Sequence, residues 1–177
     1  MKFIIIHGAY GNPEESWFPW LRKELEKLGE VIVPEFPTPE GQTLENWRKV
    51  FNSSDKGTIL IGHSLGPAFI LDLLERHKAK AAFLVAGFIR KLGLEEYDSI
   101  NYTFFKEFDW ETIKKNCPKF FIYHSDNDPF VPLKYGQEIA DKLGAELALI
   151  KGAGHFNEKA GYFKFEKLLE DIKEVLK

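Results

Sequence analysis

The chain has 177 residues, of which 44% are hydrophobic and 29% charged, and its net charge is −3. This length suits one domain with a substantial core and leaves too little chain for two. Because acidic and basic residues are interspersed, without a basic face, the composition argues against a nucleic-acid-binding protein.

Short apolar, β-branched runs alternate with segments of helical periodicity along the whole chain. The apolar runs predict strands at 2–7, 31–33, 58–61, 81–86, 119–123 and 146–150. The periodic segments predict helices at 14–28, 43–51, 68–74, 110–115, 133–143 and 158–176, with 87–103 irregular. This alternation predicts an α/β fold: a three-layer αβα sandwich with a mainly parallel central sheet of about six strands, in a single domain over 1–177.

The segment 43–51 illustrates how a helix is predicted. Thr43 is a suitable N-cap, because its hydroxyl can accept a hydrogen bond from the first free backbone N–H groups. Leu44, Trp47, Val50 and Phe51 then fall on one face of the helix.

The third apolar run leads directly into Gly62-His63-Ser64-Leu65-Gly66, and a helical segment follows. A strand, G-x-S-x-G and a helix form the context of a nucleophile elbow, in which a strained turn exposes the serine at the end of a sheet. The flanking glycines allow the strand and the helix to approach closely. Ser64 is therefore the candidate nucleophile.

A serine hydroxyl needs a base, and the base needs an orienting acid. Two later loops, each after a predicted strand, supply these groups: one contains Asp126 and Asp128, and the other contains His155. The order Ser, Asp, His is one known order of a catalytic triad. We expect His155 to act as the base and Asp128 as the acid. Asp126 is the alternative acid, although we expect it to hydrogen-bond within its loop.

Three other histidines, His63, His77 and His124, do not follow the triad order, and we expect structural or solvated roles for them. The oxyanion of an acyl-transfer reaction needs backbone donors. The N–H of Leu65, after the nucleophile, is one candidate. The loop after the first strand supplies the other, with Ala9 the first choice and Tyr10 the second. That loop lacks both G-x-G-x-x-G and G-x-x-x-x-G-K-[ST], which argues against a nucleotide-binding loop.

These segments resemble the α/β-hydrolases, through His7-Gly8, the elbow, 128–132 and 154–156. The chain is more narrowly similar to the small serine hydrolases related to YdeN-type proteins and retinoblastoma-binding protein 9, through 17–21 and 108–118. The resemblance implies a compact hydrolase without a large cap domain, an esterase-like activity (EC 3.1.1), and a triad of Ser64, Asp128 and His155. The L-x-C-x-E motif for binding a retinoblastoma pocket is absent, since Lys residues stand two positions either side of Cys117.

The substrate is expected to be a small-molecule ester. Tyr10, Trp17 and Phe88 are candidate residues of an acyl pocket, with other aromatic residues of 87–110, although each is equally suited to the core. A peptidase, a thioesterase, or a weakly active binding or regulatory protein on a hydrolase scaffold are the alternatives. We expect no cofactor, no metal, no nucleic acid and no membrane partner. One cysteine, and no apolar run of signal or membrane length, lead us to expect a cytoplasmic protein.

Overall fold

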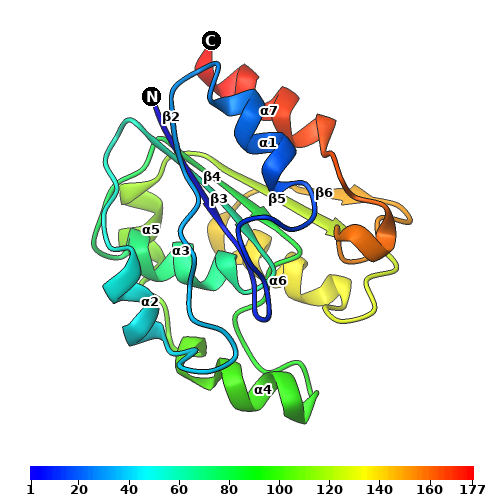
Figure 1. The fold of residues 1–177 in the computed structure, drawn as a ribbon. Coiled ribbons are helices and arrows are strands. Elements are labelled where there is room, and N and C mark those ends of the chain that lie inside the picture. Colours follow the sequence, from blue (N-terminus) through cyan, green and yellow to red (C-terminus); the bar gives the residue numbers. More distant parts are fainter.

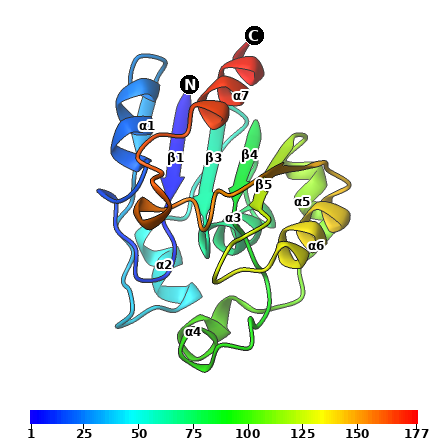
Figure 2. The ribbon, with the colours of Figure 1, turned by 90° about the vertical axis from the view of Figure 1, so that its right-hand side faces the viewer.

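One sheet of six parallel strands runs through the centre of the molecule (Figures 1 and 2). The structure is a computed structural model that describes residues 1–177. The strands are β1 (Lys2–Ile6), β2 (Glu30–Ile32), β3 (Thr58–His63), β4 (Ala81–Val85), β5 (Phe120–Ser125) and β6 (Leu147–Ile150). They lie in the order β2-β1-β3-β4-β5-β6, and every neighbouring pair is parallel. The fold predicted from the alternation of strands and helices is confirmed.

Helices cover both faces of this sheet. They are α1 (Phe18–Leu25), α2 (Leu44–Val50), α3 (Gly66–Leu74), α4 (Glu95–Asn101), α5 (Trp110–Asn116), α6 (Leu133–Leu143) and α7 (Glu166–Leu176), with short 3-10 turns η1 (Tyr102–Phe104) and η2 (Glu158–Ala160). Helices α1 and α7 lie on one face, and α2, α3, α5 and α6 on the other (Figures 1 and 2). Helix α4 lies beyond the carboxyl ends of the strands.

The strand β1 shows why two separate cores form. Side chains alternate between the faces of a strand. Phe3 and Ile5 therefore enter the core under α1 and α7, while Ile4 and Ile6 enter the core under α2, α3, α5 and α6. All four are fully buried. The sheet is apolar on both faces, as expected of parallel strands with helices on each side.

Several boundaries differ from the sequence prediction. Helix α1 begins at Phe18 rather than at residue 14, because Ser16 adopts a left-handed φ of 52°. The segment 87–103 is not irregular throughout, since it contains α4. The predicted helix 158–176 is broken at Gly161, whose φ is 78°, and α7 starts five residues later. On the apolar face of α2, Leu44 and Trp47 are buried, whereas Val50 is 46% exposed.

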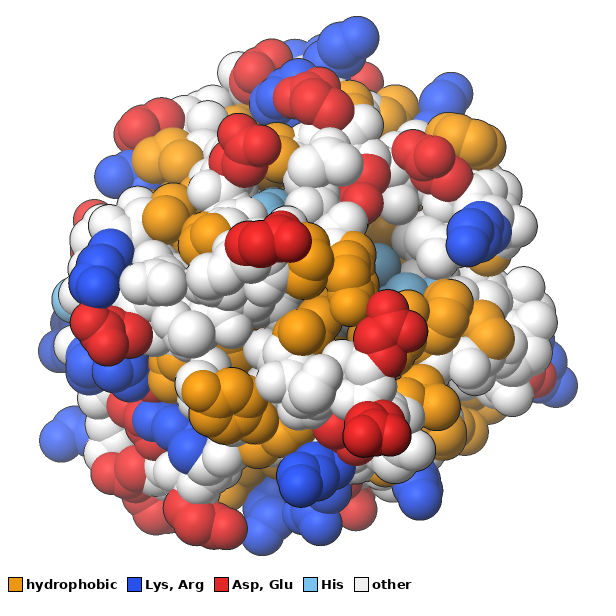
Figure 3. All heavy atoms as spheres, turned by 60° about the horizontal axis from the view of Figure 1, so that its bottom comes forward, with side chains coloured by type: hydrophobic (Ala, Val, Ile, Leu, Met, Phe, Trp, Pro, Cys, Tyr) orange, Lys and Arg blue, Asp and Glu red, His pale blue; other side chains and the backbone are white.

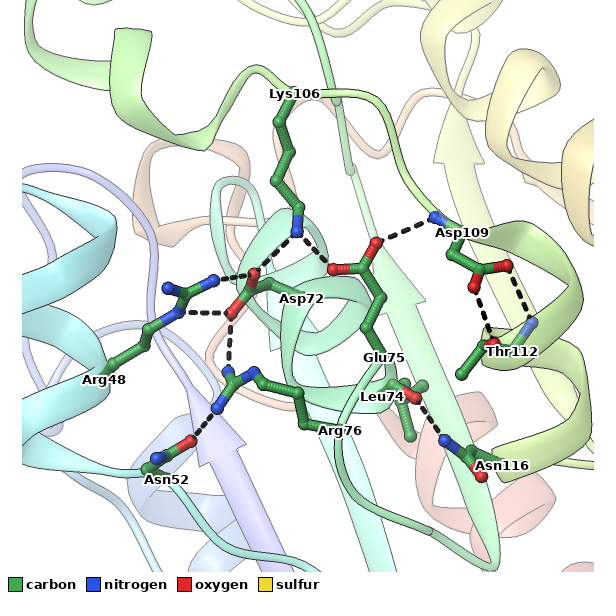
Figure 4. Close-up of polar contacts among 10 residues, drawn as sticks. All are labelled: Arg48, Asn52, Asp72, Leu74, Glu75, Arg76, Lys106, Asp109, Thr112 and Asn116. Carbon is green, nitrogen blue, oxygen red and sulfur yellow. Dashed lines mark hydrogen bonds and ion pairs between the residues drawn. The ribbon is translucent and has the colours of Figure 1, made fainter.

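The buried carboxylate of Asp72 links three segments on the face of the sheet that α3 covers (Figure 4). Asp72 of α3 is almost fully buried and forms ion pairs with Arg48 of α2, Arg76 of α3 and Lys106 of the segment between η1 and α5. Lys106 also pairs with Glu75. This network joins the helix that follows the elbow to the segment that carries α4 and η1 toward α5.

Candidate active site

Ser64 occupies a sharp turn between β3 and α3. Its φ is 59°, a left-handed value that an L-residue adopts only when its surroundings hold it there. A Cβ at Gly62 would lie 2.8 Å from the carbonyl carbon of Gly66, and a Cβ at Gly66 would lie 2.6 Å from the Ile6 carbonyl oxygen. Only glycine fits at either position, so the two glycines allow the turn that points the serine hydroxyl out of the sheet.

A continuous hydrogen-bonded chain connects Ser64, His155 and Asp128. His155 Nε2 lies 3.0 Å from Ser64 Oγ, and His155 Nδ1 lies 2.7 Å from Asp128 Oδ2. These residues come from three different strand ends, those of β3, β5 and β6. They meet because the carboxyl ends of parallel strands share one edge of the sheet.

The environment of Asp128 keeps its side chain charged. Burial opposes the charge, since the side chain is fully enclosed. The hydrogen bond with His155 and those from the N–H groups of Val131 and Phe130 outweigh this cost, so the pKa of Asp128 lies below its usual value. The two backbone donors lie 2.9 Å and 3.0 Å from Oδ1, which leaves Oδ2 for His155. Asp126 instead accepts a hydrogen bond from the Gly152 N–H at 2.8 Å, so it links its loop to the loop after β6 rather than bonding within its own loop as expected.

The loop after β1 lies against Ser64. A Cβ at Gly8 would be 2.7 Å from the Ser64 Cβ, so glycine is needed for this approach. The Tyr10 N–H donates to the Thr38 hydroxyl at 2.6 Å, which commits it elsewhere. The N–H groups of Ala9 and Leu65 take part in none of the backbone hydrogen bonds of the loops. Ala9 is therefore better placed than Tyr10 as the second donor toward an oxyanion.

Buried histidines brace the loops that carry these residues. His63 Nε2 bonds to the His155 carbonyl oxygen at 2.7 Å, and His124 Nε2 bonds to the Val131 carbonyl oxygen at 2.8 Å. His7 Nε2 accepts the Phe36 N–H at 3.0 Å. Burial lowers the pKa of all three side chains, to about 3 in His63, and so keeps them neutral.

His63 and His124 have structural roles, as expected, but their contacts with the loops that carry His155 and Asp128 are not predicted from the sequence. The only sequence signal is positional, since His7, His63 and His124 all lie at the ends of buried strands.

A cavity of about 260 Å³ opens over Ser64 and His155. Figure 3 shows histidine atoms at the bottom of a hollow that hydrophobic and acidic side chains surround. Its lining includes Ala9 and the aromatic residues Tyr10, Phe88, Tyr97 and Phe130.

Trp17, which the sequence suggested as a pocket residue, does not line the cavity. It is fully buried between the sheet, α1 and the His155 loop, and its Nε1–H donates to the Phe156 carbonyl at 2.9 Å. Its large apolar ring suits the core, and its one polar atom finds a partner there. The prediction for Trp17 is therefore wrong, and the residue supports the His155 loop from behind.

No group of three or more His, Cys, Asp or Glu side chains is arranged to hold a metal ion. None of the helices combines the length and apolar character needed to cross a bilayer.

Comparison with known proteins gives matches along nearly the whole chain. Serine hydrolase RBBP9 of Rattus norvegicus is 32% identical over 99% of this chain and 95% of its own length. The YdeN protein of Bacillus subtilis is 30% identical over 91% of this chain and 88% of its own. The crystal structure of the ydeN gene product superposes with a TM-score of 0.90 at 26% identity, covering 99% of this chain and 98% of the other. The serine hydrolase family model matches residues 3–174, and the chain therefore belongs to the serine hydrolase family, with the α/β-hydrolase fold.

Proposed function

We propose that the protein cleaves carboxylic esters through a covalent acyl-enzyme on Ser64. The observation that carries the proposal is the chain of 3.0 Å and 2.7 Å contacts from Ser64 Oγ through His155 to Asp128. It gives a hydroxyl, a base within reach of its proton, and an acid that orients the base.

The first half of the reaction acylates Ser64. His155 Nε2 takes the hydroxyl proton as Ser64 Oγ attacks the ester carbonyl carbon. The carbonyl oxygen becomes an oxyanion, which the N–H groups of Leu65 and Ala9 stabilise by about 3 kcal/mol each. The tetrahedral intermediate then collapses, the bond to the alcohol oxygen breaks, and the imidazolium gives its proton to the departing alcohol.

The second half returns the enzyme to its starting state. A water molecule attacks the acyl-serine carbonyl while His155 Nε2 takes a proton from it. The second tetrahedral intermediate releases the carboxylic acid, and Ser64 Oγ recovers its proton from His155. Asp128 keeps its negative charge throughout, holds the proton-bearing Nδ1 of His155, and stabilises the imidazolium in both halves.

The cavity of about 260 Å³ is at the small end of ligand sites. We propose that it accepts a short acyl group or a modest ester, with Tyr10 and Phe88 as walls. The residues described account for the chemistry without a cofactor, so a small-molecule ester is the one partner we propose. The lone, buried Cys117 is compatible with a cytoplasmic location, which remains part of the proposal.

Hydrolysis of p-nitrophenyl acetate, butyrate and decanoate by the wild type and Ser64→Ala tests the proposal. We expect the wild type to favour acetate or butyrate over decanoate, and Ser64→Ala to lose at least about 10³-fold in kcat. Ser53→Ala, which removes an exposed hydroxyl outside the cavity, is the matched control and keeps full activity. Equal turnover by Ser64→Ala, faster decanoate cleavage, or a much higher kcat/KM for an aminoacyl amide or acyl-thioester would contradict the proposal.

A further inference from the structure

One carboxylate in the catalytic cavity has no role in the triad. Glu15 lines the same cavity as Ser64 and His155, and it is half-buried. A Cβ at Gly11 would lie 2.5 Å from Glu15 Oε1, so the absence of a side chain at Gly11 makes room for this carboxylate. The backbone N–H of Asn12 is the one group that favours its charged form, and no side chain forms an ion pair with it.

The charges around Glu15 leave it without a counterion. Glu158 lies near enough to disfavour a second negative charge, and its own Oε1 accepts the Ser16 N–H at 3.0 Å. Arg22 forms an ion pair with Glu14 instead, with 2.7 Å between Arg22 Nη1 and Glu14 Oε1. Burial, followed by the charge of Glu158, raises the pKa of Glu15 to about 7. A positive charge brought into the cavity would stabilise the ionised form of Glu15.

Lys159 is the one Lys or Arg side chain that lines the cavity. It is exposed to solvent and forms no ion pair with Glu15 or Glu158. A strongly hydrated ammonium on a flexible, exposed side chain is a weak partner for a half-buried carboxylate. Lys159 therefore leaves the interior position beside Glu15 open to a cation on the substrate.

The aromatic part of the cavity favours the same ligand chemistry. Tyr10 and Tyr97 meet edge to face with ring centroids 5.8 Å apart, and Phe130 packs against Tyr97 at 5.9 Å. All three line the cavity. Faces of aromatic rings attract organic cations, quaternary ammonium groups in particular.

We propose that Glu15 is a specificity-determining residue that selects esters whose acyl or alcohol arm carries an organic cation. The inference rests on the proposed ester hydrolysis and adds the class of substrate to it. The carboxylate and the aromatic walls together bind the cationic group while the ester carbonyl lies at Ser64.

Two matched pairs of esters test this. One pair places the charge on the alcohol, as choline butyrate against 3,3-dimethylbutyl butyrate. The other places it on the acyl arm, as phenyl 4-(trimethylammonio)butanoate against phenyl 5,5-dimethylhexanoate. Each pair exchanges a trimethylammonium group for a tert-butyl group of similar shape, so the ratio of kcat/KM within a pair reports charge recognition. Assays at about pH 8, above the pKa of Glu15, keep the carboxylate ionised.

We expect the wild type to prefer the charged member of at least one pair by about tenfold, as one charge-assisted contact provides. Glu15→Gln should bring that ratio close to one. Lys159→Gln should raise it, since this change removes the competing positive charge. Glu170→Gln, which removes the same charge from the exposed surface of α7 outside the cavity, should leave the ratio unchanged.

The possible failures are distinguishable. Turnover of both members with a wild-type ratio near one, or an unchanged ratio in Glu15→Gln, would refute the role of Glu15 and leave the proposed function intact. Absence of turnover for all four esters and for the p-nitrophenyl esters would refute the proposed function and, with it, this inference. If Glu15→Gln fails to fold, Lys159→Gln still tests the inference, because this variant should raise the ratio. An unchanged ratio in Lys159→Gln would then refute the role of Glu15.

Discussion

Two carboxylates lie two residues apart in the loop after β5, and only one reaches His155. Asp128 contacts His155 Nδ1 at 2.7 Å, whereas Asp126 is exposed and accepts the Gly152 N–H. A negative charge behind the imidazole stabilises its protonated form in the transition state. The same charge two residues away is solvated and contributes little.

Asp128→Asn therefore should lower kcat for p-nitrophenyl butyrate by about 10³–10⁴-fold, because the amide carries no charge and favours the wrong tautomer of His155. Asp126→Asn, the matched control, should change kcat by less than about threefold, since its loop hydrogen bond needs an acceptor rather than a charge. Steady-state kinetics of the two variants measure this. Comparable losses in both would show that the loop, rather than the acid, sets the activity.

At the level of the elements, the ion-pair network of Asp72 joins α2, α3 and the segment before α5 (Figure 4). Burial opposes the charge of Asp72, but hydrogen bonds from Arg48 and Lys106 prevail and lower its pKa. Its three cationic partners are each about one-third exposed, so solvent screens part of the interaction.

Asp72→Asn should reduce the free energy of unfolding by about 2 kcal/mol, since it leaves three cations around a buried neutral amide. Asp141→Asn, on the exposed face of α6, should change it by less than about 0.5 kcal/mol. Urea denaturation followed by circular dichroism gives both values. If the midpoint for Asp72→Asn equals that of the wild type, the network does not stabilise the fold.

The same elements show how far a sequence predicts this structure. Helix α6 is found at 133–143, as expected, because its apolar period is strong and Gly144 ends it with a φ of 65°. Helix α4 is not predicted from the sequence because its residues are largely polar and it lies away from both cores. The late start of α1 and the break before α7 arise at left-handed residues, Ser16 and Gly161. Such turns are stabilised by distant contacts, here the Glu158 bond to the Ser16 N–H.

In the candidate site too, some residues could be predicted from the sequence and others could not. Ser64, Asp128 and His155 could be placed from chain order and strand ends, because a parallel sheet brings those ends together. Trp17 could not be placed, since an aromatic residue on an amphipathic segment suits a core and a pocket equally well. Glu15 carries no motif, and its position in the cavity depends on the turn at Ser16 and the space beside Gly11.

For the molecule as a whole, the buried neutral histidines make stability depend on pH. The folded-state pKa values of His7, His63 and His124 lie below the usual 6.5. The unfolded chain therefore binds more protons than the folded one below that pH, and their contribution to stability is complete above 6.5 and is lost as the pH falls. Glu15, with its raised pKa, acts in the opposite sense for a single proton.

The free energy of unfolding should accordingly fall between about pH 7 and about pH 5. His63→Gln should remove about 2 kcal/mol of that fall, because the pKa of His63 is lowered to about 3 and glutamine does not titrate. His77→Gln, at a partly exposed site, should remove much less. Urea titrations at both pH values decide the matter. An identical pH dependence in wild type and His63→Gln would mean that His63 is not held neutral by the fold.

We propose Ser64 as the nucleophile of this serine hydrolase. Mass spectrometry of peptides from the protein after treatment with a fluorophosphonate tests it most directly, because the reagent modifies a serine that an adjacent base activates. We expect one phosphonyl adduct on the peptide that carries Ser64, and its loss at the same exposure time in His155→Ala. An adduct on another residue, or no adduct in a protein that hydrolyses esters, would contradict it.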